Sequence, residues 1–151
     1  FGDVSGGQRA SILKFLAPTL VAPTEDELRF AFGDRESGLS HLAAAYYRET
    51  DARGLVITMG ARGALLFHPP TGGPRLQTEF LPALDAISVD NVGAGDVFLS
   101  GLVLGELTAD RALGMYVGAA LASEHVQRIG NEPVELLDLR ELIASRPEHR
   151  V

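Results

Sequence analysis

The chain has 151 residues, of which 46% are hydrophobic and 22% charged, and its formal net charge is −7 at pH 7. A chain of this length can bury one hydrophobic core, and its negative charge argues against non-specific binding to nucleic acid. Cysteine is absent, which excludes disulfides, thiolate catalysis and cysteine zinc sites, and no apolar run reaches the roughly 18 residues of a membrane span.

The chain begins with Phe1 rather than Met, and no signal pattern follows. We therefore expect a fragment or a cleaved product, and a cytoplasmic location. No internal repeat or linker divides the sequence. We predict a single α/β nucleotide-binding domain over residues 1–151, with a loose tail over residues 146–151.

The first predicted elements are a buried strand and two helices. The apolar run Leu20–Pro23 ends at a proline and favours a short buried strand. A helix follows directly, with Thr24 as N-cap and Glu27 three residues later, which is the spacing of a capping box. A second helical pattern covers Ser37–Thr50.

Two strands are predicted next, over Gly54–Gly60 and Gly63–His68 around the turn "GARG", and "RLQTEFL" is predicted as an edge strand. The remaining pattern is helical, from Ala94 to about Leu107, from about Ala109 to Arg128 and from about Val134 to Ser145. Strands that alternate with helices predict an α/β layer fold with a mainly parallel sheet. In such sheets ligands bind beyond the carboxyl ends of the strands.

The stretch "DNVGAGDVFLSGLVLGEL" contains the first candidate site. Between Gly93 and Gly105 the only ionisable residue is Asp96, and apolar residues fall on every side of the predicted helix. This pattern predicts a helix that is buried nearly all round. Gly101 and Gly105 lie four residues apart, which indicates tight packing or a close ligand, since glycine weakens a helix by about 1 kcal/mol.

The small residues at the start of this helix favour an anion site. Gly93, Ala94 and Gly95 leave backbone N–H groups uncovered at the positive end of the helix dipole. Asp96 beside them is either a helix-capping acid or a catalytic carboxylate. The catalytic interpretation suits phosphoryl transfer, because the carboxylate can accept the proton of an attacking hydroxyl.

Two further candidate sites follow predicted strands. In "PTEDE", Glu27 belongs to an acidic cluster that is either a set of helix-dipole partners or a magnesium shell acting through water. In "TMGARG", the residues Thr58, Gly60 and Gly63 form either a plain hairpin turn or a backbone surface for a nucleotide. The four histidines show no metal-ligand spacing, and neither GxxxxGK[ST] nor GxGxxG occurs.

The motifs "PTEDE", "VITMGARGALLF" and "DNVGAGDVFLSG" occur in this order. They resemble the NxxE element, the TxGxxG stretch and the DTxGAGDxFxxG signature of pfkB-type, ribokinase-like carbohydrate kinases. Two segments, "PTEDELRFAFGDRESG" and "VQRIGNEPV", look most like the branch of this family that contains bacterial heptose-phosphate kinases. The resemblance implies the carboxyl-terminal half of a three-layer ribokinase-like sandwich with a mainly parallel sheet.

The resemblance also implies residue roles in an ATP- and Mg²⁺-dependent kinase. Asp96 would be the base that deprotonates the sugar hydroxyl, and Glu27 the acid that organises Mg²⁺ and its waters. The signature has Asn91 where the family commonly has Thr, and the NxxE element has Thr24 in place of Asn. The other implied residues are Gly93, Ala94 and Gly95 for the anion hole, Thr58, Gly60 and Gly63 for the nucleotide, Ala122, His125 and Asn131 for the adenine, and Asp90 for a monovalent cation.

Family members of this kind are about twice as long, and their amino-terminal half supplies most sugar contacts and the lid. We therefore expect the chain to be inactive alone, to leave apolar sheet surface uncovered, and to associate with itself or with a missing half. The expected partners are ATP and a sugar or sugar phosphate. Two alternatives remain, a non-catalytic nucleotide-binding module and a plain interaction domain in which Asp96 is only a cap.

Overall fold

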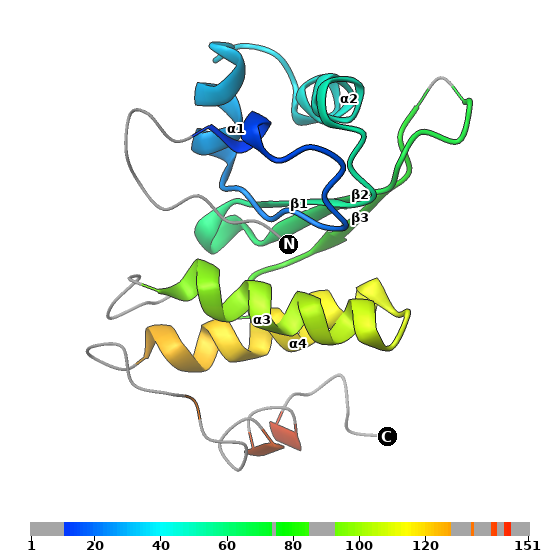
Figure 1. Cartoon of the computed structure of the whole chain (residues 1–151). Helices are drawn as coiled ribbons and strands as arrows, with labels where there is room; N and C mark the ends of the chain where they lie inside the picture. Colours follow the sequence, from blue (N-terminus) through cyan, green and yellow to red (C-terminus); the bar gives the residue numbers. More distant parts are fainter. Residues whose placement is uncertain are drawn as a thin grey trace. The chain divides into compact units, whose positions relative to one another are not determined.

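A computed structural model of the chain describes residues 11–73, 75–84, 93–127, 134, 140–141 and 144–145. The chain forms two compact units, Phe1–Pro82 and Ala83–Val151, and each is described by itself. Figure 1 labels the helices and strands of both units. The single domain expected over the whole chain stays a prediction.

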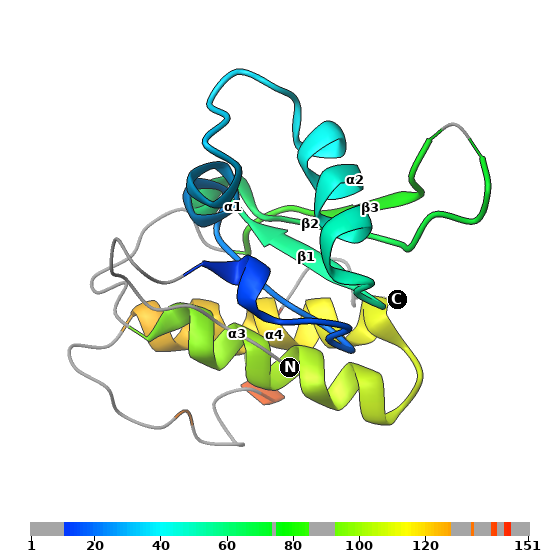
Figure 2. The ribbon, with the colours of Figure 1, turned by 45° about the horizontal axis from the view of Figure 1, so that its top comes forward.

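The first unit combines a small sheet with two helices. Figures 1 and 2 show α1 and α2 on the same side of the sheet. Its elements are the 3-10 turns η1 (Ile12–Lys14) and η2 (Gly60–Arg62), the helices α1 (Glu25–Phe32) and α2 (Leu39–Thr50), and the strands β1 (Leu55–Thr58), β2 (Ala64–Phe67) and β3 (Thr78–Leu81).

The strands of this sheet pair in the order β1-β2-β3, and both pairs are antiparallel. Parallel pairing occurs only at two bridges in the described part of the chain, Val21 with Leu55 and Thr24 with Thr58. The expected mainly parallel sheet is therefore not confirmed by the described strands. The reason is the short turn between β1 and β2, because parallel neighbours need a crossover of a dozen or more residues.

The core of the first unit lies between the sheet and the two helices. Leu55 and Ile57 of β1 and Phe67 of β2 pack with Tyr46 and Leu42 of α2 in one buried cluster. The apolar sheet surface that we expected to be uncovered is therefore not found on β1, all of whose apolar side chains are buried. On the edge strand β3, by contrast, Phe80 is 59% exposed.

The predicted start of the first helix is confirmed. Thr24 is the N-cap of α1, and its hydroxyl accepts a hydrogen bond from the Glu27 N–H at 3.2 Å. The Glu27 carboxylate in turn accepts from the Thr24 N–H at 2.8 Å. This reciprocal pair satisfies two backbone donors that a helix start leaves without partners.

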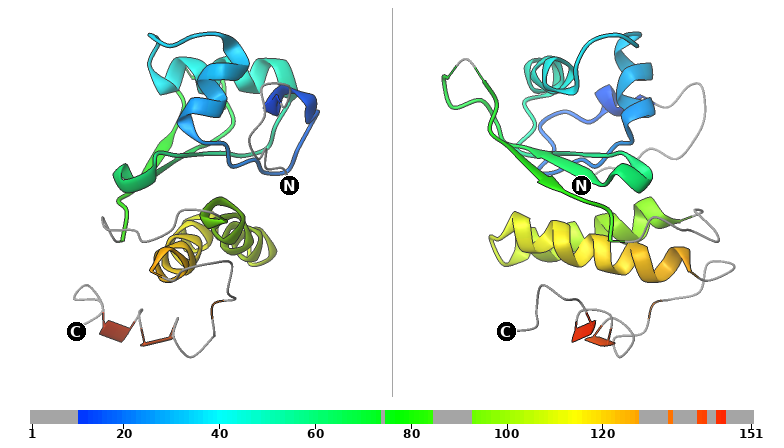
Figure 3. Two further views of the ribbon diagram at one scale, coloured as in Figure 1. Left: turned by 90° about the vertical axis from the view of Figure 1, so that its left-hand side faces the viewer. Right: turned by 180° about the vertical axis from the view of Figure 1, so that it is seen from behind.

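The second unit is an antiparallel helix hairpin of α3 (Ala94–Leu107) and α4 (Arg111–Val126), which lie side by side in Figure 3. Glycines allow the two backbones to approach closely. A Cβ atom built on Gly101 would lie 2.3 Å from the Cα of Gly118, and one on Gly105 would lie 2.5 Å from the Cα of Gly114. The tight packing predicted for Gly101 and Gly105 is confirmed.

The burial of α3 differs from our expectation of a helix buried nearly all round. Phe98, Gly101 and Leu102 are buried, but Leu104 is 51% and Leu107 is 77% exposed. The apolar sequence of the helix is uniform, whereas α4 covers only one of its faces. Because apolar residues occur all round α3, its sequence does not indicate which positions face α4.

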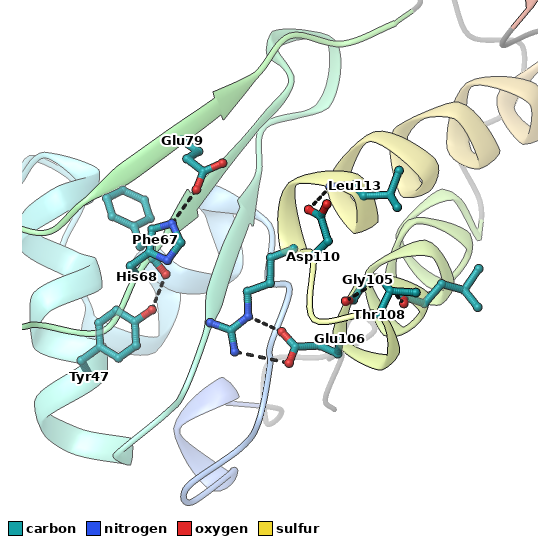
Figure 4. Close-up of polar contacts among 11 residues, drawn as sticks. Tyr47, Phe67, His68, Glu79, Gly105, Glu106, Thr108, Asp110 and Leu113 are labelled. Carbon is teal, nitrogen blue, oxygen red and sulfur yellow. Dashed lines mark hydrogen bonds and ion pairs between the residues drawn. The ribbon is translucent and has the colours of Figure 1, made fainter.

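Short polar contacts fix the turn between the two helices (Figure 4). The Asp110 carboxylate accepts from the Leu113 N–H at 2.9 Å and so caps α4. The Thr108 hydroxyl donates to the Gly105 carbonyl at 3.1 Å. Of the last predicted helix, the structure describes Val134 and the helical residues Arg140, Glu141, Ala144 and Ser145, and the tail over 146–151 lies outside the described residues.

Two neighbouring tyrosines of α2 should respond in opposite ways to the loss of their hydroxyl groups. The Tyr47 hydroxyl donates to the Phe67 carbonyl (Figure 4), whereas the buried Tyr46 hydroxyl has no hydrogen-bond partner among the described residues. Burial also raises the pKa of Tyr46. We expect Tyr47→Phe to lower the free energy of unfolding by about 1 kcal/mol and Tyr46→Phe to leave it unchanged or raise it.

Urea unfolding of both variants and the unchanged chain measures this difference. The two changes remove the same atom from the same helix, so each variant is the control for the other. Equal destabilisation by both would contradict the assignment.

Candidate functional site

Two of the predicted sites lie side by side in the first unit. The bridge between Thr24 and Thr58 brings the start of α1 to the end of β1. Here the Thr58 N–H donates to the Pro23 carbonyl at 2.9 Å, and the Thr58 hydroxyl donates to the same oxygen at 3.4 Å. Pro23 lies just before the acidic cluster, and Thr58 lies just before the glycine turn. Although these two residues are 35 positions apart in the sequence, their contact brings the cluster and the turn together on one surface.

Glu27 has a structural role at this surface. Its Oε2 atom accepts the Thr24 N–H in the capping box. No other described residue donates to this carboxylate, which is half-buried. One carboxylate oxygen therefore remains for a water or a magnesium-bound water, and this donor set fits the ion's preference for carboxylate oxygen and water.

The turn over residues 59–63 favours glycine at one position and requires it at another. Gly60 has φ 58°, and Gly63 has φ 92° with ψ −149°, a combination open essentially to glycine alone. The turn closes through the Met59 N–H, which donates to the Gly63 carbonyl at 2.8 Å. Gly60, Ala61 and Arg62 are exposed, so the backbone of the turn is accessible to a ligand.

The sequence interpretation missed an ionic contact that joins this turn to α1. The Glu25 carboxylate accepts from Arg29 Nε at 2.8 Å and from Arg62 Nη2 at 2.5 Å. These two hydrogen bonds hold the pKa of Glu25 below its ordinary value, and the one from Arg29 has the larger effect. The spacing of Glu25 and Arg29 in one helix could have signalled the first contact. No local pattern points to Arg62.

The start of α3 carries the third site, in the second unit. Gly93 is the N-cap with φ 82°, and no side chain caps the helix. The first intrahelical bond runs from the Val97 N–H to the Gly93 carbonyl at 3.1 Å. The N–H groups of Ala94, Gly95 and Asp96 therefore have no acceptor within the helix, which is the arrangement that binds anions at helix starts.

Asp96 is exposed at the third position of α3. No described residue donates a hydrogen bond to its carboxylate, and the Ser100 hydroxyl contacts only its backbone oxygen, at 3.0 Å. Within the described chain Asp96 therefore does not form the capping contact that we considered as the alternative. Asp96 belongs to the same first helical turn as the uncovered N–H groups.

The predicted adenine residues lie at the same end of the helix hairpin. Because Gly101 contacts Gly118 in an antiparallel pair, the last turns of α4 lie beside the first turns of α3. Ala122 is half-buried in these turns, and His125 is 2% exposed. A ligand there would meet Ala122 more readily than His125.

The structure therefore collects the predicted residues in two groups. Glu27, Thr58, Gly60 and Gly63 share a surface of the first unit, and the remaining described residues share one end of the second. Asp90 and Asn131 lie outside the described residues. Within the described ranges there is no group of three or more acidic or histidine residues that could hold a metal ion. No helix among them is long and apolar enough to cross a membrane.

Comparison with known proteins gives a family match over most of the chain. Residues 3–134 match the pfkB family carbohydrate kinases. This range includes all three motifs and both groups of residues. A search of the curated proteins found no significant match.

Solved structures with this fold include three from plants and bacteria. The Arabidopsis thaliana ribokinase complexed with ribose and ATP has a TM-score of 0.69 at 23% identity, covering 82% of this chain and 40% of its own. The Escherichia coli phosphofructokinase-2 in complex with potassium has a TM-score of 0.72 at 19% identity, with coverages of 87% and 42%. A putative ribokinase II from Escherichia coli in complex with ATP and Mg²⁺ has a TM-score of 0.69 at 18% identity, with coverages of 85% and 40%.

These likenesses show a ribokinase-like fold. The chain spans about 40% of the length of the solved structures, so it represents part of that fold. The predicted fold class is confirmed in this respect.

Proposed function

Because this chain belongs to the pfkB family of carbohydrate kinases, we propose that it is the ATP-binding and catalytic part of an enzyme that phosphorylates a sugar hydroxyl. The acceptor is a sugar or a sugar phosphate. The observation that carries the proposal is the start of α3. There, the exposed Asp96, whose carboxylate has no donor among the described residues, belongs to the same helical turn as N–H groups that have no acceptor in their helix.

In this proposal Asp96 is the general base. Its carboxylate accepts the proton of the attacking sugar hydroxyl as the oxygen bonds to the terminal phosphorus of ATP, while the bond from that phosphorus to the bridging oxygen breaks and ADP leaves. The N–H groups at Gly93, Ala94 and Gly95 stabilise the charge that develops on the transferred phosphoryl group. Helix α3 holds both parts in one rigid turn, so that base and anion hole keep a fixed separation.

Each unit, taken by itself, offers candidate residues for contacts with a nucleotide. In the first unit, Thr58, Gly60 and Gly63 would lie against a nucleotide, at a turn whose tip is exposed. In the second unit, Ala122, His125 and Asn131 would flank the adenine. This assignment is supported by the ATP that the Arabidopsis ribokinase and the Escherichia coli ribokinase II contain. A monovalent cation near Asp90 is also part of the proposal, and the Escherichia coli phosphofructokinase-2 binds potassium.

Glu27 is the residue that would hold Mg²⁺, through a water. When bound, the ion neutralises charge on the phosphate oxygens. The Glu27 carboxylate keeps one oxygen for this purpose while the other caps α1. Direct ligands would come from the nucleotide phosphates, in keeping with the way Mg²⁺ binds in kinases.

The chain alone should not phosphorylate sugars, because a lid and most sugar contacts are expected from a further half. A kinase of this kind works where ATP is supplied, so the cytoplasm is the proposed location. Association with the sugar-binding half, or of two chains with one another, is the proposed assembly. The exact sugar, including a heptose phosphate, depends on residues of that half.

Calorimetric titration of this chain with ATP in the presence of Mg²⁺ tests the nucleotide site. We expect saturable heat with about one nucleotide per chain. Absence of heat at millimolar nucleotide would contradict the proposal and would favour a plain interaction domain. Binding without any phosphoryl transfer, even when the sugar-binding half is present, would favour the second candidate, a non-catalytic nucleotide-binding module.

A substitution at Glu27 should separate its two roles. Glutamine at this position can still accept the Thr24 N–H, because Gln also completes a capping box. We expect Glu27→Gln to change the free energy of unfolding by less than about 0.5 kcal/mol. In the unchanged chain, Mg²⁺ should raise the affinity for ATP. We expect Glu27→Gln to make this rise about tenfold smaller, because the carboxylate charge that contacts the ion through water is lost.

Titrations of ATP with and without Mg²⁺ measure this effect. Asp26→Asn removes the charge of the neighbouring exposed acid and is the matched control. If Glu27→Gln and Asp26→Asn changed the effect of Mg²⁺ on ATP affinity equally, the magnesium role of Glu27 would be contradicted and only its capping role would remain.

A further inference from the structure

One ion pair connects the nucleotide turn of the first unit to the acidic helix start. Arg62 in the 59–63 turn donates to the Glu25 carboxylate in the first turn of α1 at 2.5 Å. The two side chains differ in freedom, since the Arg62 side chain is 69% exposed and the Glu25 side chain is 16% exposed. The pair therefore consists of an exposed cation and a sheltered anion.

Glu25 is fixed independently of Arg62. Arg29, one helical turn later, donates to the other Glu25 oxygen at 2.8 Å. The Arg29 guanidinium also donates to the Ser37 carbonyl at 2.9 Å, which anchors it to the loop after α1. The carboxylate that Arg62 meets is thus held in place before the pair forms.

The turn itself has few other ties to α1. Its described backbone bonds are internal, from the Arg62 N–H to the Met59 carbonyl at 3.2 Å and from the Gly63 N–H to the Gly60 carbonyl at 2.9 Å. A turn with two glycines at positive φ has many accessible conformations in the absence of tertiary contacts. Met59, at the base of the turn, packs against the hydrophobic core of the unit. At the exposed tip, the Glu25–Arg62 pair is the described polar side-chain contact to α1.

We propose that Glu25 and Arg62 are positioning residues that hold the 59–63 turn against α1, so that the nucleotide surface is formed before the ligand binds. This inference rests on the proposed nucleotide role of Thr58, Gly60 and Gly63. Preorganisation of a loop raises affinity by removing the cost of ordering it. Exposed ion pairs add little to global stability, so the pair acts on the turn and not on the fold.

The test compares Glu25→Gln, Arg62→Gln and the double variant with the unchanged chain. Glu49→Gln, which removes one exposed acid of α2, is the matched control. Hydrogen exchange of the free chain is measured for the amides of the 59–63 turn, together with the dissociation constant for ATP with Mg²⁺ and the thermal midpoint. Each single variant should speed exchange in the turn and weaken binding by about two- to fivefold, the strength of an exposed ion pair.

The double variant decides between positioning and direct contact. If the residues act as a pair, the double variant binds no more weakly than Glu25→Gln alone, because Arg62 then has no partner left to lose. A further loss when Arg62→Gln is added to Glu25→Gln would show that Arg62 contacts the nucleotide itself, and would overturn the proposal. So would unchanged exchange in the turn, or an equal response of Glu49→Gln.

The proposed function and the positioning role can fail separately. If the unchanged chain binds no nucleotide, the proposed function is contradicted. The exchange measurement uses no nucleotide and reports on the Glu25–Arg62 contact in either case.

Discussion

Replacing Gly101 or Gly118 with alanine should destabilise the helix hairpin by roughly 3 kcal/mol, the upper part of the range for overpacking. A Cβ on Gly101 would lie 2.3 Å from backbone atoms of Gly118, and one on Gly118 would lie 2.5 Å from the Phe98 carbonyl oxygen. Backbone atoms on both sides leave no flexible side chain that could move away. The two helices would have to separate, which would open the contacts along their whole seam.

Urea unfolding or the thermal midpoint measures this loss. Gly73→Ala is the control, because no atom lies within 4 Å of a Cβ at that position. Alanine normally stabilises a helix relative to glycine by about 1 kcal/mol. A gain in stability at Gly101 would therefore mean that the helices do not approach as closely as described.

Replacing Asp96 with Asn should lower the kcat of sugar phosphorylation by about 10²- to 10⁴-fold, the usual contribution of a general base. Asn keeps the size of the side chain but does not accept a proton at neutral pH. The affinity for ATP with Mg²⁺ should stay within about twofold, because the N–H groups of the helix start are unchanged. The assay needs this chain together with the sugar-binding half.

Two observations make this prediction specific. The Asp96 carboxylate receives no hydrogen bond from described residues, so its replacement should not alter the fold. Asp51→Asn is the matched control, since Asp51 is an exposed acid at the end of α2 in a left-handed conformation that Asn also accepts. Equal kcat values for Asp96→Asn and the unchanged protein would contradict the role of Asp96 as general base.

Local sequence patterns were sufficient for the start of α1 and for both ends of α3, whereas the predicted ends of α4 were two residues too wide. The capping box of Thr24 and Glu27 and the bounds of α3 follow from contacts within four residues, which a sequence records directly. The close approach at Gly101 and Gly105 was also predictable, because glycine in a helix has few other purposes. Its partners Gly114 and Gly118 were not identified, although they repeat the same spacing four residues apart.

Contacts between distant segments were not predictable. The alternation of strands and helices favoured a parallel sheet, yet the short turn at Gly60–Arg62 makes β1 and β2 antiparallel neighbours. The pair of Glu25 and Arg62 joins residues 37 positions apart. Such a pair leaves no periodic signal, because it depends on how segments meet after folding. The antiparallel direction of β1 and β2, by contrast, could have been inferred from the short turn "GARG" between them.

The central claim is that this chain carries the catalytic centre of a sugar kinase. The most direct measurement follows ATP and sugar by ³¹P nuclear magnetic resonance, with this chain joined to its sugar-binding half and a panel of sugars and sugar phosphates. We expect ATP-dependent formation of a new phosphate ester on one sugar class, lost in Asp96→Asn and kept in Asp51→Asn. Tight binding of ATP with Mg²⁺ without ester formation on any member of the panel would contradict the central claim.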